Sequence, residues 1–194
     1  MSSVALAPSI VRTPTLARDV AIVAAGVALI SLCAQIVVPL PFTPVPITGQ
    51  TLGALLVGGA AGFARGGIAF AVYMLVGALG APVFADGSSG FAVFTSVTGG
   101  YLVGMLVAAA FVGWAAERGW DRRVIPALAS MIAGNAIVYL IGATWLGISL
   151  NIDVATTLDL GVTPFLIGDA IKIGLAACAL PAAWALVDRI RSAA

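Results

Sequence analysis

The sequence contains no histidine and few charged residues of any kind. The absence of imidazole removes the commonest general base and most zinc sites. Only 9% of the residues are charged, compared with about 25% in soluble domains. No glycine-rich segment ends in Gly-Lys-Ser or Gly-Lys-Thr, so the chain itself is not expected to bind and hydrolyse ATP. The two cysteines, Cys33 and Cys178, lie in apolar segments and are expected to be small core residues rather than a disulfide.

Apolar residues, in contrast, make up 61% of the chain, and the mean hydropathy is +1.14. These values and the repeated apolar runs of membrane length predict an all-α, polytopic membrane protein. We expect one membrane domain over residues 1–194, with residues 1–16 as a disordered tail and a six-helix bundle over residues 17–190. The six expected transmembrane helices cover residues 16–39, 48–63, 66–79, 97–117, 125–148 and 163–187, and the main loops cover residues 80–96 and 149–162.

The charges predict the orientation of these helices. All the arginines fall in the N-terminal tail or its junction with the first helix, in the turns near residues 65 and 117–123, or at the C-terminus. The opposite loops carry Asp86, Asp153 and Asp159 and no basic residue. Because basic residues collect on the cytoplasmic side, both termini are expected to be cytoplasmic. Residues 48–63 and 66–79 are short for two crossings, but a single crossing there would place the C-terminal arginines outside, against the rule.

One segment, residues 162–174, combines a carboxylate with the only lysine of the chain. Asp169 and Lys172 are three residues apart, so they project from neighbouring points of one helix face. Each charge would cost roughly 2.5–3.5 kcal/mol at the centre of a bilayer, so both should face protein or a wet cavity. They form either a structural ion pair or a ligand site.

Other polar and aromatic residues are expected near this pair, at the outer ends of the helices. Pro39, Pro41, Pro44 and Pro46 exclude a helix and predict a stiff extended segment, either a connector or the wall of a site. A small-molecule site needs aromatic walls and a few convergent polar groups. Ordinary packing, or for Asn135 a hydrogen bond between helices, would also explain these residues. The candidates are Phe42, Gln50, Asp86, Ser88, Tyr101, Asn135 and Tyr139.

The first helix carries small residues at regular spacing. Such a surface lets another helix approach closely, either within the bundle or from a separate membrane subunit. The residues are Ala17, Ala21, Ala24, Ala25 and Ala28.

Taken together, several motifs resemble the BioY family, the biotin-specific substrate-binding (S) subunits of energy-coupling-factor (ECF) transporters. The resemblance covers nearly the whole chain from the first helix onward, and its most specific parts are the proline segment and the Gly-Asp-x-x-Lys helix. It rests on the proline segment through Thr51, Gly-Ala-Pro-Val-Phe-Ala at 80–85, Thr-Gly-Gly-Tyr-Leu at 98–102, Tyr-Leu-Ile-Gly-Ala-Thr-Trp-Leu at 139–146, and Pro164 through Lys172.

The resemblance implies a six-helix subunit that captures biotin with high affinity from outside a bacterial or archaeal cell membrane. Its implied partners are biotin, a membrane T subunit and a pair of cytoplasmic ATP-binding subunits. It further implies that Asp169, Lys172 and the loop from Asp86 to Gly90 contribute to the biotin pocket, and that Ala21, Ala25 and their neighbours dock the T subunit. We expect no enzymatic activity, cofactor, metal ion or nucleic acid.

Several alternatives stay open. The chain could be an S subunit for another vitamin, or a biotin transporter that works alone. An intramembrane enzyme would have little acid–base machinery here, since histidine and a Gly-x-Ser-x-Gly motif are lacking. A purely structural membrane protein would show no stabilisation by a ligand.

Overall fold

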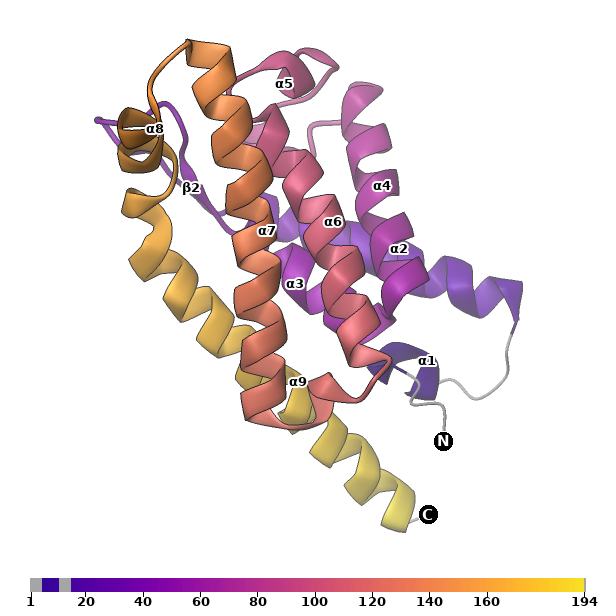
Figure 1. Ribbon diagram of the computed structural model, residues 1–194. Coiled ribbons are helices and arrows are strands. Elements are labelled where there is room, and N and C mark those ends of the chain that lie inside the picture. Colours follow the sequence, from indigo (N-terminus) through magenta and orange to yellow (C-terminus); the bar gives the residue numbers. More distant parts are fainter. Residues whose placement is uncertain (1–4, 11–14, 194) are drawn as a thin grey trace.

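A computed structural model describes residues 5–10 and 15–193 as a mostly helical bundle (Figure 1). The helices are α1 (Leu6–Ile10), α2 (Leu16–Ala34), α3 (Gln50–Ala61), α4 (Phe63–Ala78), α5 (Ala92–Thr95), α6 (Gly99–Ala116), α7 (Val124–Leu150), α8 (Val154–Gly161) and α9 (Leu166–Ala193). Short 3-10 turns are η1 (Ala85–Gly87), η2 (Trp120–Arg122) and η3 (Thr163–Phe165), and a two-stranded antiparallel ribbon joins β1 (Val37–Val38) to β2 (Ile47–Thr48).

Helix α6 lies at the centre of the bundle and packs against α7, α3 and α4. It is the most buried of the long apolar helices. Small residues permit this close packing. A Cβ atom added at Gly58 of α3 would meet the backbone of Ala109 in α6.

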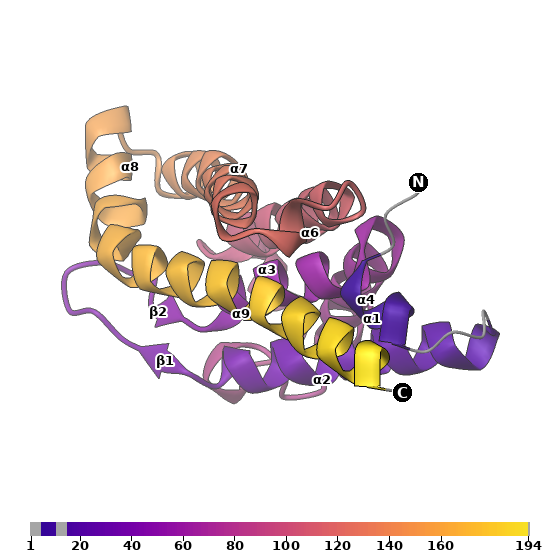
Figure 2. The same ribbon diagram turned by 90° about the horizontal axis from the view of Figure 1, so that it is seen from below.

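The two ends of the bundle differ in structure. The ribbon, α5 and α8 lie at one end, whereas α1, the C-terminal part of α9 and the turn between α6 and α7 lie at the other (Figure 1). Figure 2 shows α1 beside the C-terminal end of α9, which it contacts. Both views show α2 crossing the direction of α6 and α7 at a steep angle.

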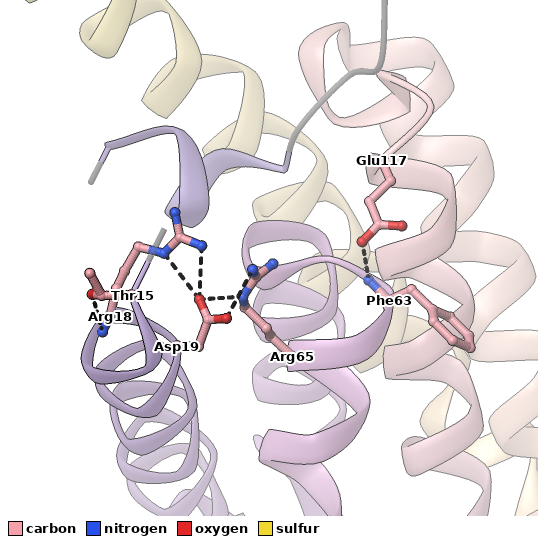
Figure 3. A network of polar contacts seen from close by, with 6 residues as sticks. All are labelled: Thr15, Arg18, Asp19, Phe63, Arg65 and Glu117. Carbon is pink, nitrogen blue, oxygen red and sulfur yellow. Dashed lines mark hydrogen bonds and ion pairs between the residues drawn. The ribbon is translucent and has the colours of Figure 1, made fainter. Parts of the chain in front are cut away.

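Polar contacts join α2 to α4 and α4 to α6 (Figure 3). Asp19 of α2 accepts hydrogen bonds from Arg65 of α4 on both carboxylate oxygens, at 3.0 and 3.3 Å, and from Arg18 at 3.0 Å. At the start of α4, the backbone N–H of Phe63 donates to Oε1 of Glu117 at 3.0 Å, which satisfies one of the unpaired donors of that helix end.

The ends of the expected helices differ from those observed. The first helix ends at Ala34 rather than at residue 39, because Val37 and Val38 pair with β2 and precede a proline, which disfavours helix. The expected loop at 149–162 contains α8, capped by the Asp153 side chain. The expected loop at 80–96 contains η1 and α5. The last helix starts at Leu166, after η3, and continues to residue 193.

Two further expectations need correction. Residues 6–10 of the expected disordered tail form α1, and Leu6 is buried against α3 and α9, while residues 1–4 and 11–14 lie outside the described residues. Cys33 is buried as expected, but Cys178 is exposed on the outer face of α9.

By length and composition, four of the described segments can cross a membrane: α2, α6, α7 and the stretch from Val154 to Ser192 that includes α9. The other two expected spans correspond to α3 and α4, which are apolar but have only 12 and 16 residues. These segments support a multi-pass membrane protein.

Candidate ligand site

A cavity of about 410 Å³ lies beneath the ribbon and the proline segment. This volume falls within the range of about 300–1,000 Å³ typical of small-molecule sites. Its walls come from the segments 37–48 and 84–88, the first turn of α3, and the facing sides of α6, α7 and α9. The lining residues are Val37, Pro39, Leu40, Thr43, Pro44, Val45, Pro46, Thr48, Gln50, Thr51, Phe84, Ala85, Asp86, Ser88, Val93, Thr98, Tyr101, Leu102, Met105, Val138, Tyr139, Phe165, Asp169 and Lys172.

An ion pair on α9 forms one edge of this cavity. Lys172 Nζ lies 2.8 Å from Asp169 Oδ1, one helical turn away. The side chains are only 15% and 7% exposed, respectively. Lys172 Nζ also donates to Thr51 Oγ1 of α3 at 3.1 Å. The pair therefore connects α9 to α3 across the cavity.

The second oxygen of Asp169 is held by α7. Tyr139 donates its hydroxyl proton to Asp169 Oδ2 at 2.5 Å, and Asn135 Nδ2 donates to the same oxygen at 3.1 Å. Asn135 Oδ1 is buried and has no hydrogen-bond partner among the described residues. Hydrogen bonds from three side chains to the two oxygens therefore fix the position of the Asp169 carboxylate at the edge of the cavity.

Further hydrogen bonds fix the other polar walls. Gln50 Nε2 donates to the Tyr73 hydroxyl at 2.6 Å, which orients the amide at the start of α3. The Tyr101 hydroxyl donates to the Gly161 carbonyl at 2.8 Å, and Thr43 Oγ1 donates to the Leu160 carbonyl at 2.7 Å. The last two bonds join α6 and the proline segment to the end of α8.

Comparisons with known proteins bear on what this cavity binds. The BioY family profile matches residues 4–189. The chain belongs to the BioY family. The biotin transporter BioY of Rhizobium etli is 37% identical over 147 residues, which cover 72% of this chain and 78% of the relative. The probable biotin transporter BioY of Pyrococcus horikoshii is 36% identical over 160 residues, covering 82% and 92%.

A solved structure agrees with this assignment. The crystal structure of the S-component for biotin from an ECF-type ABC transporter matches with a TM-score of 0.79 and 26% identity, covering 93% of this chain and 95% of that one. The BioY family and these relatives are transporter components, so this chain is not an enzyme.

In this BioY-family fold, most candidate residues of the sequence analysis come together at the cavity. Asn135 lies behind the wall and reaches the site through Asp169. Phe42 does not belong to the wall: it is 61% exposed in the turn of the proline segment, whereas the next residue, Thr43, is buried and lines the cavity. The candidates that line the cavity are Gln50, Asp86, Ser88, Tyr101, Tyr139, Asp169 and Lys172.

Sequence reasoning missed several wall residues. Thr51 contacts Lys172 directly, yet a threonine in an apolar helix gives no distinct signal. Thr48 lies two residues before Gln50, which was identified, so proximity to that residue could have identified it.

The five candidate alanines of α2 are all exposed, so the interpretation that they pack within the bundle is wrong: Ala17, Ala21, Ala24, Ala25 and Ala28. The buried side of α2 consists instead of Gly26, Ile30, Cys33 and Ala34. Ala17, Ala21 and Ala25 line a second, shallow groove of about 740 Å³ between α2, α3 and α9, whereas Ala24 and Ala28 are exposed outside it.

Proposed function

We propose that this chain is the high-affinity biotin-binding S subunit of an ECF vitamin-uptake transporter, which captures biotin from outside the cell. The observation that carries the proposal is the Asp169–Lys172 pair at the edge of a partly open, largely apolar cavity. Biotin offers a carboxylate and a ureido group at the two ends of an apolar body. Lys172 would face an anionic or carbonyl oxygen, and Asp169 would accept from the ureido N–H groups.

The apolar walls suit the rest of such a ligand. Val93, Leu102, Met105 and Val138 offer hydrocarbon surface between the polar groups. The names of the relatives and of the matching structure favour biotin over another vitamin. Competition with thiamine and riboflavin separates these alternatives.

The proposal includes a membrane arrangement. We infer six spans in a bacterial or archaeal cell membrane, with α3 and α4 as short crossings and both termini cytoplasmic. The support is the distribution of charge. The arginines at positions 65, 118, 122 and 191 belong to the end of the bundle opposite the cavity, whereas every charged residue of the described loops around the cavity is acidic.

The partners are inferred from the same family. A membrane T subunit would dock on the exposed alanines of α2, where small side chains allow close approach of another helix. A pair of ATP-binding subunits would then power uptake. A chain that imports biotin alone is the alternative.

The decisive experiment is calorimetric titration of biotin into the purified protein in detergent. We expect stoichiometric binding, weakened about 10- to 100-fold in Lys172→Ala, since a hydrogen bond to a charged group is worth about 1.5–3 kcal/mol. Arg123→Ala, which removes an exposed cation at the start of α7, is the matched control and should bind like wild type.

Two results would count against the proposal. Equal affinity of wild type and Lys172→Ala would remove the direct role of the lysine. Folded wild-type protein that shows neither heat nor thermal stabilisation with biotin would exclude the ligand itself.

A further inference from the structure

The segment between α4 and α5 covers one side of the cavity with an unusual backbone. Phe84, Ala85, Asp86 and Ser88 line the cavity. Asp86 has a φ of 55°, in the left-handed region that non-glycine residues rarely adopt, and Gly87 follows with a φ of 65°. A backbone of this kind persists only where surrounding contacts hold it in place.

Two anchors hold the ends of this segment. The ring of Phe84 is buried and packs edge-on against Tyr73 at 5.4 Å, and the Gly90 N–H donates to the Gly77 carbonyl at 2.8 Å. Between these anchors, the Phe84 N–H donates to the Ser88 carbonyl at 3.1 Å, which closes the turn on itself without attaching it to another element.

The side chain of Gln35, at the C-terminal end of α2, attaches this turn to the bundle. Its Nε2 donates to the carbonyls of Phe84 at 3.2 Å and Val83 at 3.4 Å, and its Oε1 accepts from the Gly87 N–H at 3.1 Å. The same Nε2 lies 3.1 Å from the Ser31 carbonyl of α2, which orients the amide. One side chain thus holds the turn before and after Asp86.

A carboxamide on a side chain of this length suits this set of contacts, because its nitrogen donates two hydrogens while its oxygen accepts. A glutamate would keep the bond from Gly87 but would lose both bonds donated to the turn and would place charge against carbonyl oxygens. A methionine of similar length would lose all three.

We propose that Gln35 is a positioning residue that holds the 83–88 turn against the cavity and thereby slows the release of bound ligand. The inference rests on the proposed function only for the identity of the ligand. The contact between Gln35 and the turn does not depend on it. Because the turn forms a wall and does not touch the Asp169–Lys172 pair, loosening it should act on ligand escape more than on ligand capture.

The test compares Gln35→Met and Gln35→Glu with the control Ser89→Ala, which alters an exposed residue of the same loop outside the cavity wall. Labelled biotin is chased with excess unlabelled biotin to give the dissociation rate, and association is followed separately. We expect about three- to tenfold faster dissociation in Gln35→Met, an association rate within about twofold of wild type, and no change in Ser89→Ala.

Hydrogen exchange at the Gly87 amide provides a readout that needs no ligand. Exchange of this amide should accelerate in Gln35→Met and stay slow in Gln35→Glu, where the acceptor oxygen remains. An unchanged melting temperature of the ligand-free variants would show that the fold is intact. Unaltered dissociation in Gln35→Met, or unaltered exchange at Gly87, would overturn the positioning role. Wild-type protein that fails to bind biotin would instead refute the proposed function, and Gly87 exchange would still report whether Gln35 holds the turn.

Discussion

The buried pair on α9 should respond asymmetrically to the loss of either partner. Asp169 accepts hydrogen bonds from Lys172, Tyr139 and Asn135, whereas Lys172 donates only to Asp169 and Thr51 among the described residues. In Lys172→Met the carboxylate keeps two donors. In Asp169→Asn the ammonium keeps only neutral acceptors, the new amide oxygen and the Thr51 hydroxyl, and loses its counter-charge.

These contacts set the expected magnitudes. Lys172→Met should cost about 1.5–3 kcal/mol, the value of a hydrogen bond to a charged group. Asp169→Asn should cost about 3–5 kcal/mol, because it leaves an uncompensated buried charge. The double variant removes both charges, so it should be less destabilised than the sum of the single variants by at least about 2 kcal/mol.

The free energy of unfolding can be measured on ligand-free protein in mixed micelles of increasing SDS content, with circular dichroism as the signal. Asp159→Asn removes an exposed carboxylate with the same change of charge, and should stay within about 0.5 kcal/mol of wild type. Equal costs of the two single substitutions, or additive costs in the double variant, would refute the asymmetric coupling.

Two further predictions concern stability elsewhere in the bundle. Gly58→Ala should cost about 1–3 kcal/mol of unfolding free energy in the same assay, because the new methyl group meets the backbone of Ala109. The control Gly174→Ala, with open space around it, should be neutral or stabilising by up to about 1 kcal/mol. Equal effects of the two substitutions would contradict the close α3–α6 packing. Burial raises the pKa of Asp121 above 3.8, so ionisation destabilises the fold as pH rises above about 4. Asp121→Asn, which can still accept from the Trp184 indole, should therefore gain stability relative to wild type from pH 4 upward, and a constant difference across pH would contradict this sign.

The long helices were predictable because their apolar runs are long enough to span a membrane. The residues at which these helices begin and end were not predictable. The ribbon was missed because strands of two residues have no periodicity to detect. Helix α8 was taken for a loop because its eight residues include Thr156 and Asp159. Its start did carry a signal: Asp153 caps the helix by accepting from the Thr156 N–H at 3.1 Å.

The site was predictable where a residue type was out of place. Asp169 and Lys172 stand out because ionisable residues are rare in apolar helices. Gln35 and Thr51 could not be identified in the same way, since their importance depends on which distant segment each one contacts. Gln35 meets residues about 50 positions later in the chain, and Lys172 meets Thr51 from 121 positions away.

The position of the cavity follows from where α3 begins. If α3 began several residues before Gln50, the side chains of its added N-terminal turns would occupy space between α6, α7 and α9. The prolines at 39–46 prevent this, since they cannot form a helix, and the ribbon brings the chain to Gln50 from the side instead. The first turn of α3 therefore presents Gln50 and Thr51 to the space that Asp169 and Lys172 border. The proline segment is thus more than a connector, because it both shortens α3 and forms the wall above the polar groups.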